Sequence, residues 1–248
     1  MANTTRRADN YPAILLLHVS KSFPRTGEVR LGRGSKDRRI VLRDVNLSVR
    51  AGEIVCILGK NGSGKTTLTK IVVTLLAPDG GDVRVCGFDT GKQEKQVRER
   101  IGVVFNAGDS GFQARLSAFS NLEYYGALYG IRRRDARNRS EMLLEMVGLE
   151  DRGPDQYQSF STGMKRRLAI ARALLPDPRV LILDEPTLGI DPWSMKQVHD
   201  LLKSIASSGK TILCTTNNQL EAVNLGGGLR ILEDGVLVEP AEKGAILA

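Results

Sequence analysis

A glycine-rich loop between a short apolar strand and a helix limits the possible folds of this 248-residue chain more than any other feature. Residues 53–58, EIVCIL, lead directly into GKNGSGKTT at residues 59–67. This loop satisfies the pattern G-x-x-x-x-G-K-[ST], in which backbone N–H groups cradle phosphate oxygens at the start of a helix. Because the flanking strand and helix that the pattern requires are both present, the sequence predicts an α/β sheet with a nucleotide-phosphate site.

The loop supplies most of the predicted ATP contacts. Lys65 is a candidate catalytic residue because its ammonium group can reach the β and γ phosphates, and the Thr66 hydroxyl is a candidate Mg²⁺ ligand. ATP and Mg²⁺ are therefore the expected cofactors, and an ordinary glycine-rich turn is the alternative. The predicted contacts are Gly59, Lys60, Asn61, Gly62, Ser63, Gly64, Lys65, Thr66 and Thr67.

A second motif, RVLILDEPT at residues 179–187, brings two carboxylates to the end of an apolar strand. Ligand chemistry in an α/β sheet lies at the carboxyl ends of strands. We expect Asp184 to orient the metal shell and Glu185 to act as the catalytic base that polarises the attacking water. Alone, such a pair is commonplace at a solvated strand end, and its specificity comes from the phosphate loop upstream.

Short β-branched runs alternate with helical stretches, a pattern typical of a mostly parallel sheet covered by helices. Between residues 105 and 179 the alternation stops and apolar residues recur at three- and four-residue spacing. We therefore predict one domain over residues 1–248, with a helical subdomain at about residues 107–173 inserted into the α/β core. The predicted strands are residues 53–58, 82–86, 102–105, 179–183, 211–215 and 229–232.

The segment FSTGM at residues 160–164 resembles the signature motif LSGGQ of ABC transporter ATP-binding proteins. Its form, with the basic residues that follow, resembles exporter ATPases, and it precedes the DEPT strand at the usual spacing. The resemblance covers nearly the whole chain and implies a P-loop NTPase core with an antiparallel β edge. It also implies that Ser161, Thr162 and Gly163 contact ATP held by the opposite subunit. A plain helix N-cap explains Ser161 alone.

Two further positions match this family. Phe23 corresponds to the aromatic residue that stacks on adenine, with core packing as the alternative. Asp191 corresponds to the aspartate that touches the partner subunit at the ATP site.

Two positions depart from the family. Asn106 replaces the expected glutamine, so its direct contact with Mg²⁺ requires backbone movement or a bridging water, and Gln113 nearby is a possible substitute. Asn217 replaces the expected histidine. We retain it as a catalytic candidate that can hydrogen-bond phosphate but cannot become cationic. The alternative is that Asn217 caps the following helix.

The resemblance implies an ATP-hydrolysing subunit that dimerises around ATP and drives export through a separate transmembrane permease subunit. The second ATPase subunit is either an identical or a different chain. The apolar runs are far below the roughly 20 residues that cross a bilayer, and no export signal is visible, so we expect a peripheral location on the cytoplasmic face of the membrane. A soluble ABC ATPase that acts on ribosomes or DNA, or a regulatory subunit with weak hydrolysis, remains the alternative.

The formal charge of +8 does not lead us to expect a specific nucleic-acid partner, because aromatic residues make up only 5% of the chain. The basic clusters at residues 25–43 and 132–139 are more typical of a solvated face or of a surface near anionic lipids. Three cysteines without C-x-x-C spacing favour buried apolar packing over a zinc site.

Overall fold

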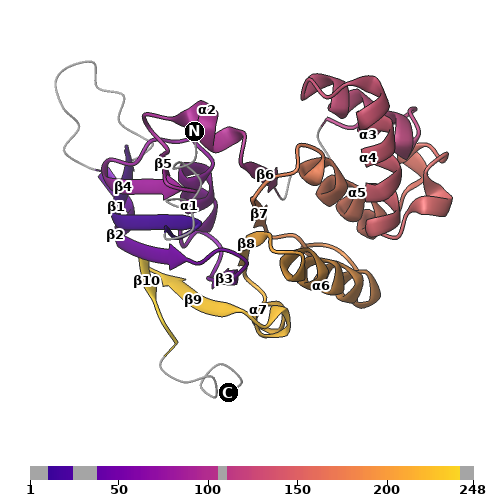
Figure 1. Cartoon of the computed structure of the whole chain (residues 1–248). Helices are drawn as coiled ribbons and strands as arrows, with labels where there is room; N and C mark the ends of the chain where they lie inside the picture. Colours follow the sequence, from indigo (N-terminus) through magenta and orange to yellow (C-terminus); the bar gives the residue numbers. More distant parts are fainter. Residues whose placement is uncertain (1–10, 25–37, 106–110, 241–248) are drawn as a thin grey trace.

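A computed structural model describes residues 11–24, 38–105 and 111–240 of the chain. Residues 25–37 of the basic cluster at residues 25–43 lie outside this range, as does Asn106. Figure 1 shows a β-rich part and, to one side of it, a helical part. In the described residues, no helix combines the length and the apolar character that a membrane span needs.

The described strands form two sheets. One is antiparallel, with the order β2-β1-β4-β5, and the other has the order β10-β9-β3-β8-β7-β6, in which only β10 is antiparallel to its neighbour. The strands are β1 (Ile14–Pro24), β2 (Arg38–Val49), β3 (Ile54–Leu58), β4 (Gly80–Val85), β5 (Phe88–Asp89), β6 (Ile101–Val104), β7 (Val180–Asp184), β8 (Thr211–Thr216), β9 (Gly228–Glu233) and β10 (Val236–Val238).

Single helices connect β3 to β4, β5 to β6, β7 to β8 and β8 to β9, whereas α3, α4 and α5 succeed one another between β6 and β7. The helices are α1 (Lys65–Val72), α2 (Glu94–Arg98), α3 (Ala118–Leu128), α4 (Arg133–Met146), α5 (Thr162–Leu174), α6 (Pro192–Ser207) and α7 (Gln219–Leu225), with 3₁₀ turns η2 (Glu150–Arg152) and η3 (Tyr157–Ser159). Serine side chains cap the first turns of α3 and α5, and Asp191 caps α6.

The predicted fold class is confirmed, and each predicted strand agrees with the structure to within two residues at either end. The sequence pattern does not tell to which sheet residues 82–86 belong. They form β4, which pairs antiparallel with β1. The physical difference lies in burial, since only alternate residues of β4 are buried near its end whereas every residue of β7 and β8 is buried. One half-exposed face is typical of an antiparallel sheet.

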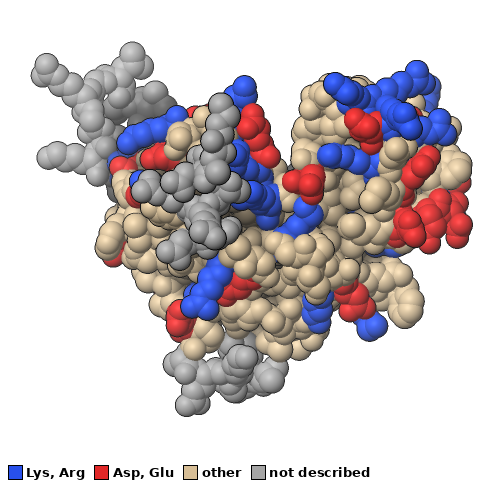
Figure 2. Space-filling model, viewed as in Figure 1, with Lys and Arg blue, Asp and Glu red and all other residues tan. Residues whose placement is uncertain are grey.

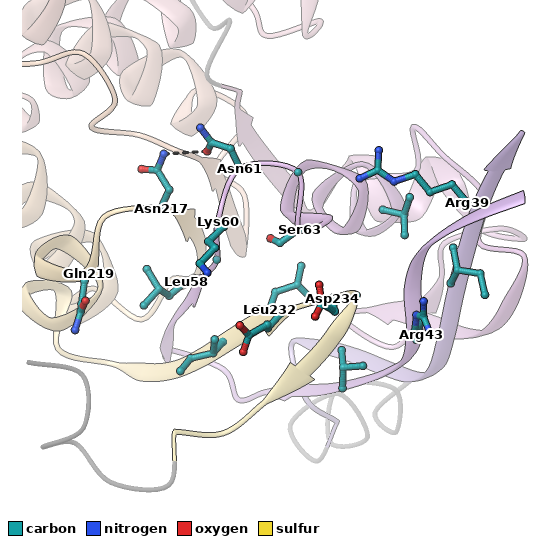
Figure 3. Close-up of a pocket in the computed structure, with 18 of the residues that line it drawn as sticks. Arg39, Arg43, Leu58, Lys60, Asn61, Ser63, Asn217, Gln219, Leu232 and Asp234 are labelled. Atoms are coloured by element: carbon teal, nitrogen blue, oxygen red, sulfur yellow. Dashed lines mark hydrogen bonds between the residues drawn. The ribbon is translucent and has the colours of Figure 1, made fainter. Parts of the chain in front are cut away.

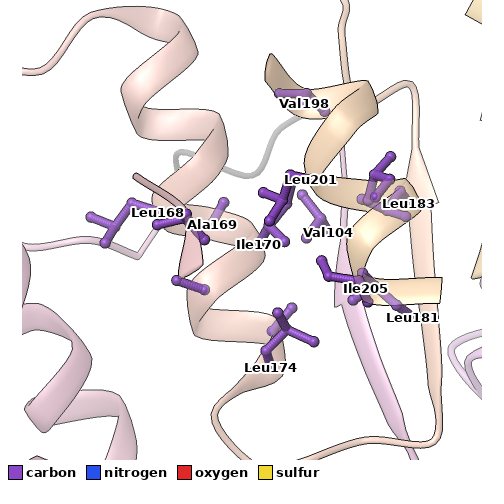
Figure 4. Close-up of a cluster of buried hydrophobic side chains, with 14 of the residues drawn as sticks. Val104, Leu168, Ala169, Ile170, Leu174, Leu181, Leu183, Val198, Leu201 and Ile205 are labelled. Atoms are coloured by element: carbon purple, nitrogen blue, oxygen red, sulfur yellow. The ribbon is translucent and has the colours of Figure 1, made fainter. Parts of the chain in front are cut away.

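Apolar packing covers both faces of the six-stranded sheet. On one face α1 contributes Leu68, Ile71 and Val72 to a core shared with the antiparallel sheet. On the other, α5 and α6 pack on β6 and β7, as Figure 4 shows for Ile170 and Leu201. The carboxyl ends of the parallel strands are thereby held rigidly beside the loop that leads into α1.

A tight approach between the sheet and a covering helix occurs at Gly102 in β6, where a Cβ atom would lie 2.3 Å from the carbonyl oxygen of Ala173 in α5. We expect Gly102→Ala to force β6 and α5 apart and to lower the free energy of unfolding by about 1–3 kcal/mol, the usual cost of overpacking. Gly80→Ala is the matched control because no atom lies within 4 Å of its Cβ position. Denaturant unfolding of both variants checks this; equal stabilities would contradict it.

Candidate functional site

The loop between β3 and α1 adopts a conformation that its glycines make possible. Gly62 and Gly64 have φ values of 80° and 111°, in the left-handed region that side chains disfavour. A Cβ atom on Gly59 would lie 2.7 Å from the carbonyl oxygen of Leu232. The backbone therefore wraps closely around the start of α1, as a phosphate cradle requires.

Lys65 fills the centre of this loop, and its side chain is only 4% exposed. Its ammonium group donates to the carbonyl oxygens of Gly59 at 2.7 Å and Lys60 at 3.2 Å. It also lies 3.2 Å from Oε1 of Glu185. A buried cation needs such compensation, and an arriving phosphate would offer it a stronger partner.

Asp184 lies at the end of β7 and joins two hydroxyl groups. Its Oδ2 accepts from Thr66 Oγ1 at 2.9 Å, and its Oδ1 accepts from Thr215 Oγ1 at 2.5 Å. Two hard oxygen atoms, one on Asp184 and one on Thr66, thus meet at the end of the phosphate loop, and this pair of donors suits Mg²⁺. Thr215, which the sequence analysis did not identify, orients the carboxylate from the neighbouring strand.

Glu185 follows β7 directly, and its φ of 51° places this non-glycine residue in the left-handed region. Such backbone costs of order 1 kcal/mol and persists where its surroundings hold it in place. Its N–H donates to the carbonyl oxygen of Thr215 at 2.9 Å, which fixes the turn. The turn directs the carboxylate toward Lys65 and the nucleotide cavity.

These groups line one cavity of about 960 Å³. Figure 2 shows a notch between the β-rich part and the α3–α5 part, with Lys and Arg side chains along it. Phe23 borders the cavity and is 36% exposed, which argues against core packing, while its stacking on adenine stays a prediction. The lining residues include Phe23, Asn61, Gly62, Gly64, Lys65, Thr66, Thr67, Arg172, Asp184 and Glu185.

Arg172 of α5 is a cavity residue that sequence reasoning missed. Its guanidinium carbon lies 4.8 Å from the ring centroid of Phe112 and 5.0 Å from that of Tyr125. These cation–π contacts join the helical part to the cavity wall. The available signal was the set of basic residues in the helix after FSTGM, of which Arg172 is the last.

Asn217 lies on the other side of the loop, where Nδ2 donates to Oδ1 of Asn61 at 3.0 Å (Figure 3). Both line a second cavity of about 1,120 Å³, which lies between the phosphate loop, β2 and the β9–β10 hairpin. Lys60 and Ser63 of the phosphate loop also line this cavity. The alternative that Asn217 caps the next helix is wrong. The cap of α7 is Asn218, whose side chain accepts from the N–H groups of Leu220 and Glu221.

The signature residues lie away from the cavity. Ser161 caps α5 by accepting from the N–H of Met164, with Thr162 as the first helical residue. Gly163 lies against α6, since a Cβ atom there would lie 2.3 Å from Oγ of Ser194.

Asp191 accepts from the N–H of Ser194, and hydrogen bonds from Ser194 hold the pKa of the Asp191 carboxyl below its usual range. The described residues that line the Lys65 cavity do not include Ser161, Thr162, Gly163 or Asp191.

Comparison with known proteins assigns this geometry to a family. The family model described as "ABC transporter" matches residues 42–188, which contain both the phosphate loop and the two carboxylates. The chain belongs to the ABC transporter ATP-binding proteins. The predicted family is confirmed, and with it the function of an ATP-binding, ATP-hydrolysing subunit.

Individual members of the family support this assignment. The chain is 39% identical to the ABC transporter ATP-binding protein NatA of Bacillus subtilis, over 79% of this chain and 80% of NatA. It is also 39% identical to the Nod factor export ATP-binding protein I of Cupriavidus pinatubonensis, over 84% of this chain and 63% of that protein. The chain thus spans less than two thirds of the second relative.

A dimeric ATP-binding cassette, solved in a post-hydrolysis state with ADP and Pi, shares the fold. Its TM-score is 0.75 at 26% identity, over 91% of this chain and 98% of that one.

We expect Lys65→Ala to weaken ATP binding and to abolish turnover, because a preorganised cation facing the phosphates contributes about 2–4 kcal/mol. Isothermal titration with ATP and a phosphate-release assay measure the two effects. Lys210→Ala, which removes a lysine that pairs with Asp177, is the control. Wild-type turnover in the Lys65 variant would show that the site lies elsewhere.

Proposed function

We propose that this ABC ATPase hydrolyses Mg²⁺-bound ATP at a composite site formed by two copies, or by one copy and a related chain. The division of the predicted ATP contacts carries the proposal. Lys65, Thr66, Asp184 and Glu185 converge on one cavity, whereas Ser161 and its neighbours begin a helix outside that cavity. A second subunit that presents its own α5 start would complete the phosphate site with a helix N-terminus.

ATP binding would rearrange the buried ion pair. Before nucleotide arrives, the Lys65 ammonium is shared between two carbonyl oxygens and the Glu185 carboxylate. A γ-phosphate carries more negative charge than these carbonyl groups and would attract the ammonium. Glu185 is then free to accept a proton from the attacking water, which is the function of a general base.

The oxygen pair of Thr66 and Asp184 would hold Mg²⁺, which neutralises charge on the β and γ phosphates when bound. Thr215 keeps the Asp184 carboxylate in place from the next strand. Phe23, at the edge of the same cavity, would stack on the adenine ring.

The work that ATP performs would be export through a separate transmembrane subunit. Relatives bear the names Nod factor export ATP-binding protein and Linearmycin resistance ATP-binding protein. The helical part exposes large apolar side chains, among them Leu128 at 63% and Met142 at 65%, and exposed apolar side chains suit a partner surface. We therefore place the protein at the cytoplasmic face of the membrane, bound to a permease.

The composite site is tested with Glu185→Gln. The amide cannot accept the water's proton, while the phosphate contacts persist, so we expect a closed dimer that retains ATP. Light scattering after gel filtration with ATP and Mg²⁺ should show a doubled mass. The double variant Glu185→Gln, Lys65→Ala is the control and should stay monomeric. A monomer in the single variant would count against the composite site.

A second candidate function, a nucleotide sensor with weak hydrolysis, is favoured by the Asn217–Asn61 hydrogen bond. A neutral amide loses the charge-assisted contact that matters most as charge develops on the γ-phosphate, so kcat should be low.

We expect Asn217→His to raise kcat about tenfold, equivalent to about 1.4 kcal/mol, with a smaller change in KM. The melting temperature should stay constant because Asn218, not Asn217, caps α7. Steady-state kinetics and thermal melting of both proteins measure this. Flat turnover would contradict the idea that Asn217 limits the rate, and the assay needs the heterodimer if the partner is a different chain.

A further inference from the structure

A buried acid and a buried histidine lie close together near Asn217, which is called the switch position because it replaces the family's expected histidine. Glu221 of α7 is 1% exposed and His199 of α6 is 4% exposed. Nε2 of His199 lies 3.5 Å from Oε1 of Glu221, and neither atom has a hydrogen-bond partner in the described residues. Polar atoms so deeply buried are costly unless they compensate one another, so this contact fixes α6 and α7 together.

The same carboxylate holds the end of β8. Its Oε2 accepts a short hydrogen bond from the hydroxyl of Thr216, and that hydroxyl accepts from the N–H of Asn218 at 2.9 Å. Glu221 is thus connected to the residues on both sides of Asn217. Because Asn217 itself reaches Asn61 in the phosphate loop, the position of its amide depends on this buried anchor.

His199, at the other end of the contact with Glu221, lies on α6, the helix capped by Asp191, which is the residue expected to touch the partner subunit of the proposed dimer. His199 lies eight residues after Asp191, the N-cap of α6, a rise of about 12 Å along the helix. A small cavity of about 160 Å³ lies between the loop that precedes α6 and the loop that precedes α7. It is lined by Glu185, Gly189, Ile190, Thr216, Asn217 and Glu221, among others. Glu185, Asn217 and the loop before α6 therefore line the same small cavity, and Glu221 forms part of its wall.

We propose that Glu221 and His199 are positioning residues, which hold the Thr216–Asn218 loop at a fixed place relative to α6 and its Asp191. This deepens the proposed function and rests on it for the effect on turnover. Loosening the loop should affect the transition state, where Asn217 faces developing charge, more than ATP affinity, which the phosphate loop provides.

Two breaking variants, Thr216→Val and His199→Leu, test the anchor from its two ends. Thr211→Val is the matched control. It removes a hydroxyl from the opposite end of the same strand, where Thr211 accepts from the N–H of Gly52 at 3.0 Å. His199→Gln keeps a polar group opposite Glu221 and serves as the conservative variant. Three quantities are measured for each protein: amide hydrogen–deuterium exchange in residues 216–221, the Kd for ATP, and kcat.

Both breaking variants should accelerate exchange in residues 216–221 about tenfold and lower kcat by a similar factor, with Kd changed less than about twofold. Thr211→Val should lower only the melting temperature. His199→Gln should keep both the exchange in residues 216–221 and kcat close to the wild-type values. The proposal is overturned if exchange in residues 216–221 matches that of Thr211→Val, or if exchange rises while kcat is unchanged or falls only in step with ATP affinity. If the wild-type protein shows no ATP turnover, the proposed function fails, and exchange in the His199 variants alone decides the positioning claim.

Discussion

The buried ammonium group of Lys65 is the interaction on which the rest of the site depends. A cation that is 4% exposed must find negative partners, and the chain offers two carbonyl oxygens of its own loop and the carboxylate of Glu185. Those carbonyl contacts require the loop to curl around the start of α1, and the curl requires glycine at positions 62 and 64. The phosphate cradle and the ion pair therefore depend on each other: the contacts of Lys65 require the loop conformation, and that conformation requires the two glycines.

The two carboxylates at the end of β7 differ because their surroundings differ. Asp184 is satisfied by two hydroxyl donors, which leaves it ordered and suited to a metal. Glu185 lies beyond the strand on a left-handed backbone and has a movable cation as its partner. Adjacent residues of one strand end are thus suited to the separate functions proposed for them, the first as a fixed ligand and the second as a base that would be released when phosphate attracts Lys65.

Local patterns in the sequence predicted the parts of this protein that depend on neighbouring residues. The phosphate loop, β7 with its two carboxylates, and the helix start at Ser161 each need only a few consecutive positions. The sequence analysis did not predict the long strand β1, because its register with β2 shifts at three places and this breaks the alternation that a strand normally displays. Long-range pairs were not predicted either: Arg172 contacts Phe112 from 60 positions away, and Thr215 meets Asp184 only in the sheet. Nothing in a local pattern specifies such partners.

The amide pair of Asn217 and Asn61 limits what the switch position can do. Their hydrogen bond is between neutral groups, with a net value of about 1 kcal/mol, so a phosphate can displace Asn61 as the partner at small cost. A contact from the amide to phosphate would in turn be weaker than one from a cation. Under the proposed function, the affinity for ATP would come almost entirely from the phosphate loop, and the Asn217 amide would contribute position more than charge. In a site of this kind, rigid placement of the Asn217 amide matters more than it would for a charged side chain, whose attraction acts over a longer distance. That requirement is the physical reason for proposing that the buried contact between Glu221 and His199 positions Asn217.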